Sequence, residues 1–323
     1  TDDEIYNNQG FVFLQMNAEF SHGWILTTGA SLNESGLNFT RLSAIPAEVE
    51  NRKFNNQVAP RFALLKKITP MVSVYGSIAR GFSPPTTAEI LPSTNNFNTT
   101  LQAEQGIDYE AGTRGTFIKN KLYFDVNAFF YELRNAIVQR RDSSGADYFQ
   151  NAGSARQNGI ETYLSYELIN SEYHFFNHVL LYASNTWNNF HYKEFKQLDN
   201  NFSGNKMPGV APETFAAGID MNTKTGLYLN STYFFSGKIA LDDANSAFAN
   251  SYNLVGLRIG YKKYISQQTR MEIFAGAENI LNEKYSLGND INATGGRYYN
   301  VAAGRNFYAG ITFRFNKKPV SER

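Results

Sequence analysis

The sequence has no cysteine, no long apolar run and almost no net charge. The complete lack of Cys in 323 residues removes disulfides, thiolate metal sites and cysteine nucleophiles together. No stretch approaches the ~20 consecutive apolar residues that a membrane helix needs, which excludes a helical membrane protein. The net charge of +1 and the absence of a dense basic run give no support for a nucleic-acid partner.

Catalytic motifs are missing as well. The sequence contains no Gly-x-Ser-x-Gly elbow and no Walker loop. His174 and His178 are four residues apart, and on a strand this spacing separates them by ~13 Å, too far to share a metal. Acidic residues fall mainly on the polar faces of strands, where ion pairs with arginines such as Arg114, Arg258, Arg270 and Arg314 are the expected arrangement. We therefore expect no enzyme activity, no cofactor and no metal held by the protein.

The chain instead carries strands with two chemically different faces. In residues 305–315, apolar and polar side chains alternate with the period of two that a β-strand requires. The same alternation occurs in residues 107–117, 121–131 and 160–168, whose polar faces carry charges of both signs. Unpaired ions would be very costly against lipid, so we expect these polar faces to look into a wet interior.

Thirteen such strands recur along the chain, and short and long connections alternate between them without exception. The long connections are near 34–56, 81–105, 134–157, 189–212, 236–250 and 281–304. Outer-membrane barrels have this arrangement, with tight periplasmic turns and long extracellular loops. We therefore predict an all-β fold, an antiparallel transmembrane β-barrel with strands near 10–20, 24–33, 57–67, 71–80, 106–118, 121–133, 158–169, 173–188, 213–222, 227–235, 251–264, 269–280 and 305–315.

Several segments resemble one family in particular. Residues 75–90, 101–115, 151–161, 278–285 and 304–315 are similar, in this order, to segments of TonB-dependent outer-membrane receptors of the siderophore type. The resemblance implies a plugged barrel of 22 strands, of which these thirteen would be the tenth to the twenty-second. Parity agrees, because bacterial single-chain barrels have an even number of strands. Residues 1–315 would then be the C-terminal part of the barrel, without plug or TonB box, and residues 316–323 a C-terminal tail.

The resemblance also implies a function and a location. The expected function is import of a ferric siderophore or similar iron chelate across the bacterial outer membrane, with binding at extracellular loops and release powered by the TonB–ExbB–ExbD complex through the plug. Other expected contacts are outer-membrane lipid and lipopolysaccharide. Receptors for haem, cobalamin, copper or another metal complex are alternatives. So is a non-transporting surface β protein, such as an adhesin or a soluble carbohydrate-binding sandwich, whereas an outer-membrane enzyme would need catalytic groups that we do not find.

Arginines and aromatics in or near the long loops are the candidate ligand-binding residues. Arginine supplies a fixed positive charge and a planar donor fork, and aromatic rings supply flat contact area. Together they would suit an anionic metal chelate, although loop arginines and tyrosines can also simply fold the loop or meet lipopolysaccharide phosphates. The candidates are Arg80, Arg140, Arg141, Tyr148, Arg156, Trp187, Tyr192, Arg297, Tyr298, Tyr299 and Arg305.

Overall fold

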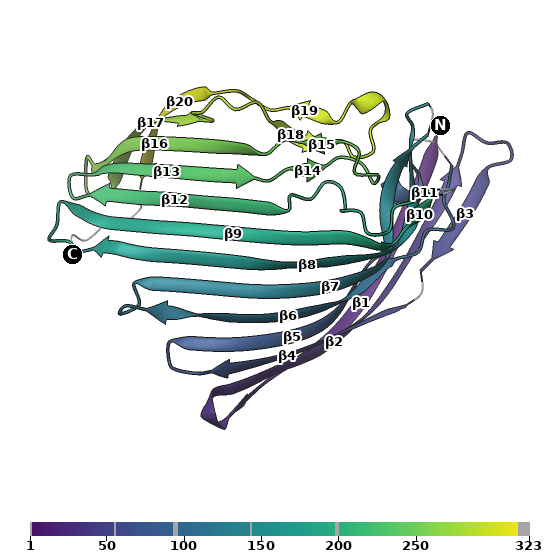
Figure 1. The fold of residues 1–323 in the computed structure, drawn as a ribbon, viewed down its shortest axis with the longest axis horizontal. Helices are drawn as coiled ribbons and strands as arrows, with labels where there is room; N and C mark the ends of the chain where they lie inside the picture. The colour runs from purple at the N-terminus through teal and green to yellow at the C-terminus, as the bar shows by residue number, and fades with distance from the viewer. Residues whose placement is uncertain (1, 55, 93–95, 143, 198–199, 316–323) are drawn as a thin grey trace.

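A single antiparallel sheet of fourteen strands dominates the structure (Figure 1), a computed structural model that describes residues 2–54, 56–92, 96–142, 144–197 and 200–315. Thirteen strands follow each other in chain order, each beside its sequence neighbour, and the fourteenth, β3, pairs with β2. The thirteen are β1 (Asp3–Phe20), β2 (Trp24–Arg41), β4 (Gln57–Lys67), β5 (Val72–Ser83), β6 (Glu104–Phe117), β7 (Leu122–Arg141), β8 (Asp147–Asn170), β9 (Phe176–Glu194), β12 (Glu213–Thr223), β13 (Leu227–Ser236), β16 (Tyr252–Tyr264), β17 (Thr269–Glu278) and β20 (Asn306–Phe315).

The remaining elements are short and lie in the connections. They are η1 (Ser21–Gly23), β3 (Glu48–Lys53), α1 (Thr87–Ile90), β10 (Lys196–Gln197), β11 (Asn200–Asn201), β14 (Ile239–Ala240), β15 (Phe248–Ala249), β18 (Ser286–Asn289), η2 (Thr294–Gly296) and β19 (Tyr299–Val301). No helix among the described residues is both long and apolar enough to cross a membrane.

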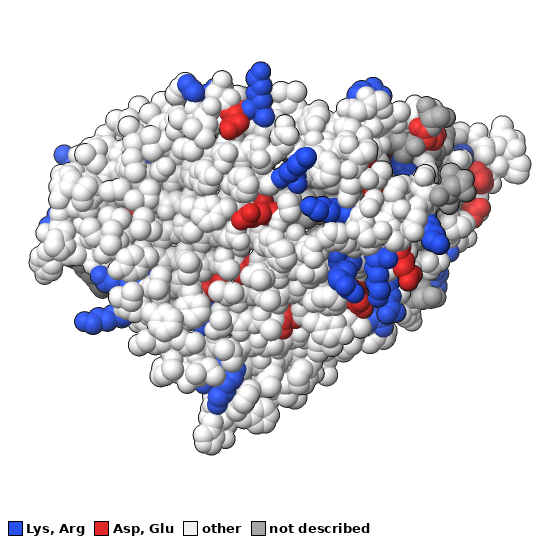
Figure 2. Space-filling view, viewed as in Figure 1, with Lys and Arg blue, Asp and Glu red and all other residues white. Residues whose placement is uncertain are grey.

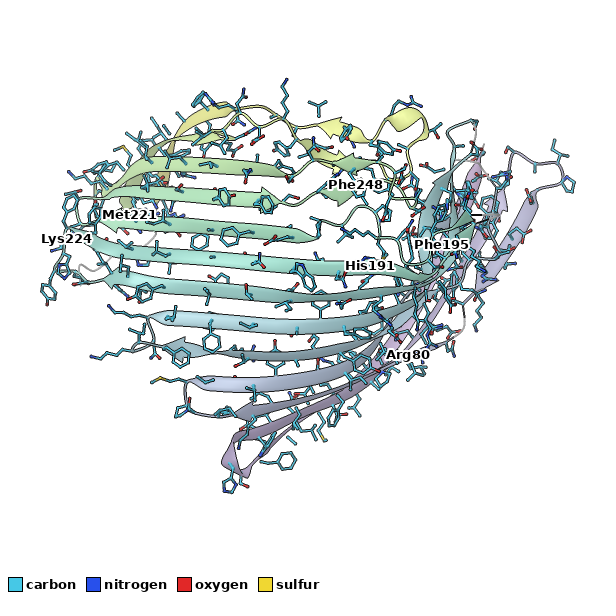
Figure 3. All side chains as sticks on the ribbon, viewed as in Figure 1. Arg80, His191, Phe195, Met221, Lys224 and Phe248 are labelled. Atoms are coloured by element: carbon cyan, nitrogen blue, oxygen red, sulfur yellow. The ribbon has the colours of Figure 1, made fainter. Side chains whose placement is uncertain are left out.

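Short turns and long connections occupy opposite ends of the sheet (Figure 1). The turn after β1 needs only three residues, Ser21–Gly23, and within it His22 and Gly23 both adopt positive φ, 61° and 76°. The sheet twists and curves, with β1 and β20 at its two edges. Figure 3 places Met221 and Lys224 at the short-turn end, and Arg80, His191 and Phe195 toward the long-loop end. The predicted number and order of the principal strands are confirmed.

One predicted loop was wrong. Residues 134–157 were expected to form a long loop, but β7 and β8 continue through most of it and are joined by residues 142–146 alone. Within it, Asn135, with φ of 55°, leaves the ladder for one residue, but the register is the same on both sides: Arg134 faces Ser154 and Ala136 faces Ala152. β2 and β9 also extend further into their expected loops, to Arg41 and Glu194.

One face of the sheet exposes apolar side chains along its whole width, which we call the apolar face. Ladder partners such as Phe62 and Ile78, or Ile273 and Ile311, are each more than 40% exposed. Soluble monomers rarely expose a contiguous apolar surface of this extent. Other exposed members of this face are Leu64, Tyr109, Ile160, Leu164, Leu181, Leu257, Ile259 and Phe313.

The opposite, polar face is organised by aromatic rings that lie over glycines of the neighbouring strand. A Cβ added to Gly112 would stand 2.4 Å from Cζ of Tyr75, and one added to Gly218 would stand 2.3 Å from Cζ of Tyr182. Glycine is thus required so that each ring can lie flat on the adjacent backbone, an arrangement that also pins the strand register. The other pairs are Tyr131 on Gly106, Phe129 on Gly159, Tyr228 on Gly260, Tyr308 on Gly276 and Phe274 on Gly310.

The polar face also holds the charges along the strands. Arg258 pairs with Glu272 at 2.9 Å, and the Tyr228 hydroxyl donates to the same carboxylate at 2.6 Å. The guanidinium of Arg114 lies 5.7 Å from the ring of Tyr75. The expected interior ion pairing is therefore seen at Arg258, whereas Arg270 and Arg314 are ladder partners of each other.

Candidate functional site

The long-loop end of the sheet is packed like a small globular core. One buried cluster joins Leu133, Ala136 and Ala155 of the β7–β8 hairpin to Tyr192 and Phe195. A second joins Leu37 and Phe39 of β2 to Phe54, Ile90 and Leu101 from the following connections. Because these side chains come from several connections, the long loops are held in one fixed arrangement.

A buried carboxylate lies at the centre of this arrangement. Asp243, in the β13–β16 connection, is 3% exposed. One of its oxygens pairs with Nη1 of Arg140, and the other accepts a hydrogen bond of 2.6 Å from the Tyr192 hydroxyl. The guanidinium of Arg140 lies over the ring of Phe195, 4.6 Å from its centroid. The buried acid is thus compensated by a charge and a hydrogen bond, as burial requires.

We call Asp243, Arg140 and Tyr192 the buried hub. Asparagine side chains connect the buried hub to the neighbouring connections. The backbone N–H of Asp243 donates to Oδ1 of Asn292 at 3.1 Å, and the Asn292 amide donates to the carbonyl of Gln139 at 3.2 Å. The Asn205 amide donates to the carbonyl of Asp243 at 2.8 Å. The β9–β12, β13–β16 and β17–β20 connections are therefore all fastened to the β7–β8 hairpin.

Burial sets the electrostatics of the hub. Desolvation lowers the pKa of Arg140, which nevertheless stays protonated at neutral pH because the ordinary value is so high. Desolvation also raises the pKa of Tyr192 to about 12. A cationic guanidinium and a neutral phenol therefore face Asp243, and none of the three polar groups is open to an arriving ligand.

The predicted ligand-binding residues fall into three separate groups. Arg140 and Tyr192 are in the buried hub, and Tyr148 is the ladder partner of Arg140. The backbone of Arg141 belongs to β7, but its side chain lies outside the described residues. The burial of Arg140 and Tyr192 favours the alternative role named above, folding of the loops.

The second group lies on the apolar face. The register places Arg80 opposite Ile107, and Trp187 opposite Ile160, on the face that carries the exposed apolar side chains. The Arg80 guanidinium accordingly donates to Oε1 of Gln105 at 2.7 Å, and that of Arg156 lies 5.4 Å from the ring of Phe130. These three residues point away from the polar interior.

The third group belongs to the β17–β20 connection. Arg297 and Arg305 are exposed, Tyr298 is half-buried, and Tyr299 is 55% exposed with its hydroxyl donating to the carbonyl of Phe248 at 3.3 Å. The base of this connection is fixed, because the buried Asn279 amide donates to the carbonyls of Glu283 and Ala303. Exposed arginines and tyrosines are here displayed on a rigid support.

The sequence interpretation missed Asp243, Asn292 and Phe195. The candidates named from the sequence were cations and aromatic rings, and an acid in the long connection at 236–250 carries no local sign that it is buried. Asp243 and Arg140 are 103 residues apart, and no local pattern joins them. Aromatic density around Tyr192 and Phe195 was the one available sign that these loops have a core.

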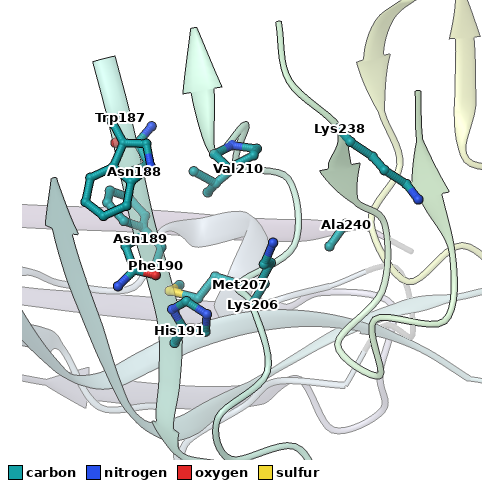
Figure 4. Close-up of a pocket in the computed structure, with 11 residues that line it drawn as sticks. Trp187, Asn188, Asn189, Phe190, His191, Lys206, Met207, Val210, Lys238 and Ala240 are labelled. Atoms are coloured by element: carbon teal, nitrogen blue, oxygen red, sulfur yellow. The ribbon is translucent and has the colours of Figure 1, made fainter. Parts of the chain in front are cut away.

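Two hollows lie near this end of the sheet. On the polar face, a hollow of about 430 Å³ includes Asp108, Glu110, Glu161 and Tyr131 in its lining. A smaller cavity of about 150 Å³ lies between β9 and the loops that follow it (Figure 4). Its lining includes Trp187, His191, Lys206, Met207, Val210 and Lys238. Among the described residues, no group of three or more His, Asp and Glu could hold a metal ion.

Comparisons with known proteins decide what this sheet is. The family model described as "TonB dependent receptor-like, beta-barrel" matches residues 1–280. The chain belongs to the TonB-dependent receptors. Members of this family are transporters of the outer membrane and not enzymes. The apolar face is therefore the lipid face, the polar face is the lumen face, and the long-loop end is extracellular.

The similar proteins are receptors for siderophores and metal complexes. The chain is 22% identical over 310 residues, 94% of its length, to the "Probable TonB-dependent siderophore receptor PiuA" of Acinetobacter baumannii, of which it covers 40%. It is 27% identical over 158 residues, 48% of its length, to the metal-pseudopaline receptor CntO of Pseudomonas aeruginosa, of which it covers 21%.

Solved structures show the same fold. The crystal structure of PiuA from Acinetobacter baumannii superposes with a TM-score of 0.76 at 18% identity, over 97% of this chain and 44% of that one. The ferric citrate transporter FecA gives 0.74 at 19% identity, over 97% and 45%. The chain thus spans less than half the length of PiuA and of FecA.

Proposed function

We propose that this chain is the C-terminal part of a receptor barrel that imports a ferric siderophore or a similar iron chelate. The edge strands β1 and β20 leave backbone groups that need partners, which the remaining strands of a barrel of 22 would supply. In this proposal a plug fills the lumen, and TonB–ExbB–ExbD supplies the energy that releases the ligand through it. The plug, and the segment through which TonB would act on it, would belong to parts of the receptor outside these 323 residues.

The observation that carries the proposal is the set of exposed arginine and tyrosine side chains on the β17–β20 connection. Arg297, Arg305 and Tyr299 are exposed above a base that buried Asn279 holds fixed. Such a rigid support reduces the cost of ordering the side chains when a ligand binds. An anionic chelate with carboxylate or aromatic groups suits these donors.

A complex of another metal is the second candidate. It is favoured by the relative named as a metal-pseudopaline receptor, and the copper transporter OprC shares the fold with a TM-score of 0.71 over 97% of this chain. Haem is disfavoured, because His191, the one histidine that the sequence placed in a long loop, lies on β9 beside Arg156 and faces lipid.

The test is a fluorescence titration of the full-length receptor with ferric siderophores of the catecholate and citrate classes, a nickel or zinc metallophore complex, and haem. A ferric chelate should bind most tightly. The double variant Arg297→Ala and Arg305→Ala should bind it about tenfold more weakly, a loss of about 1.4 kcal/mol. The control, Lys263→Ala, removes an exposed cation at the short-turn end and should leave the affinity unchanged. Tighter binding of another metal complex, or an unaltered double variant, would refute the proposal.

A further inference from the structure

Two asparagines of the β17–β20 connection fasten the segments that carry its exposed arginines. Asn282 and Asn292 both have a left-handed backbone, with φ of 55° and 56°, a conformation that asparagine tolerates better than most residues. Their side-chain amides bond to backbone groups that are distant in the sequence. Because glycine adopts the same backbone conformation without strain, replacing either asparagine by glycine should remove the amide and leave the path of the chain unchanged.

Asn292 connects the segment that carries Arg297 to the buried hub. Its Oδ1 accepts from the backbone N–H of Asp243 at 3.1 Å, and its amide donates to the carbonyl of Gln139 on β7 at 3.2 Å. Its own backbone N–H donates to the carbonyl of Leu241 at 2.9 Å. The chain is therefore fixed to two other elements just before it reaches Arg297.

The segment between Asn292 and Arg297 has little rigidity of its own. It contains Gly295 and Gly296, both exposed, with φ of 69° and 73°, and glycine loses more conformational freedom on ordering than any other residue. Beyond the glycines, the Tyr299 hydroxyl donates to a carbonyl of β15, and β18 and β19 lie beside β14 and β15 in Figure 1. The amide of Asn292 is the matching support on the near side, so its loss should release the glycines.

Asn282 fastens the returning end of the same connection. Its Oδ1 accepts from the backbone N–H of Arg305 at 3.1 Å, and a Cβ added to Gly304 would stand 3.1 Å from the same oxygen. Each exposed arginine thus has its own asparagine: Asn292 precedes Arg297 by a few residues, and Asn282 bonds directly to the backbone of Arg305.

We propose that Asn292 and Asn282 are positioning residues of the ligand site, which hold Arg297 and Arg305 in place before a chelate arrives and do not touch it. The inference rests on the function proposed above. Figure 2 shows lysine and arginine side chains gathered toward the long-loop end of an otherwise mostly white surface, so positive charge alone does not distinguish these two arginines. Their fixed backbone does, because it lowers the cost of ordering the site when the ligand binds.

The experiment titrates the full-length receptor with ferric citrate and with a ferric tris-catecholate. Asn292→Gly and Asn282→Gly should each bind the tighter of these two chelates about fivefold more weakly, because the ligand must then order the segment itself. Asn282→Asp keeps the oxygen that accepts from Arg305 and should restore most of the affinity. The matched control, Asn120→Gly, removes an amide at φ of 66° from the short turn between β6 and β7 and should have no effect.

Hydrogen exchange separates positioning from a general loss of stability. In the free receptor, residues 293–301 should exchange faster in Asn292→Gly than in the wild type, whereas exchange in the strands and the urea midpoint should be unchanged. Saturating the variant with the chelate should restore wild-type protection, because the bound ligand orders the released segment. A merely structural residue would lower the stability of the whole barrel and would give no recovery specific to this segment.

Two outcomes would overturn the inference. If the glycine variants bind both chelates as tightly as the wild type while the double variant Arg297→Ala and Arg305→Ala binds them more weakly, the asparagines do not position the site and the proposed function stands. If the double arginine variant is also unaffected, the proposed function fails together with the inference. In each case the folded fraction is checked by heat-modifiable mobility on gels.

Discussion

The two faces of strands β5 to β9 differ in where they tolerate charge. On the lumen face, acids such as Asp108, Asp125 and Glu161 are distributed along the strands among tyrosines. On the lipid face, Ile160 and Leu164 are exposed, and basic side chains such as Arg80, Arg134 and Arg156 lie toward the long loops. Water can solvate an ion at any depth of the lumen, but hydrocarbon cannot, so the lipid face confines its charges to the headgroup level.

The largest effect should come from filling a glycine on the lumen face. A Cβ at Gly112 would meet the ring of Tyr75 at 2.4 Å, so Gly112→Val should destabilise the barrel by about 3 kcal/mol or prevent its folding. The neighbouring Ala111→Val adds similar bulk on the lipid face, where the residue is exposed. Urea unfolding followed by heat-modifiable mobility compares the two. Equal losses would mean that the faces do not differ in packing.

Mutation of the buried hub should cost nearly as much stability, but it should affect the loops and not the strands within the membrane. Asp243→Ala leaves the Arg140 guanidinium unpaired in a site where it is 4% exposed, at a cost of about 3 kcal/mol. Hydrogen exchange should speed up in residues 195–212 and 237–251, whereas the strands within the membrane should exchange as before. Exposed Glu194→Ala is the control. Unchanged loop protection in the Asp243 variant would show that the hub does not hold the loops.

The hub should also set an upper pH above which the loops lose stability. The pKa of Tyr192 is raised to about 12 in the fold, above the ordinary value near 10. Its contribution is therefore complete below about pH 10 and is lost as the pH rises toward 12. Limited proteolysis of the loops should accelerate over this window in the wild type, and less so in Tyr192→Phe. If proteolysis of the wild type and of Tyr192→Phe depended on pH in the same way, a group other than Tyr192 would cause the loss of stability.

The smallest effect should come from Glu132. Its ion pair with Lys193 is partly exposed, so Glu132→Gln should change the unfolding free energy by no more than about 0.5 kcal/mol. Urea unfolding followed by heat-modifiable mobility measures this change, and a loss of more than about 1 kcal/mol would contradict the weak, solvent-screened pairing assigned to this site.

Local patterns predicted the strands, because alternation and turn residues act within a few positions of the chain. They failed at residues 134–157, where pairing with the opposite strand extends the ladder without any alternation. The face of Arg80 was readable, since it has the same parity as exposed Ile78 in β5. The hub could not be predicted from the sequence, because the partners of Asp243 are distant in the chain and come close only in the folded sheet.

Spin labelling tests the central claim, that lipid covers one face of these strands and water the other. The chain has no native cysteine, so single cysteines at positions 124 to 129 of β7 can each be labelled in the full-length receptor in bilayers. Even positions should be accessible to dissolved oxygen, and odd positions to a water-soluble nickel reagent, with a period of two. Uniformly low accessibility to oxygen, as under a second protein layer, would contradict the account.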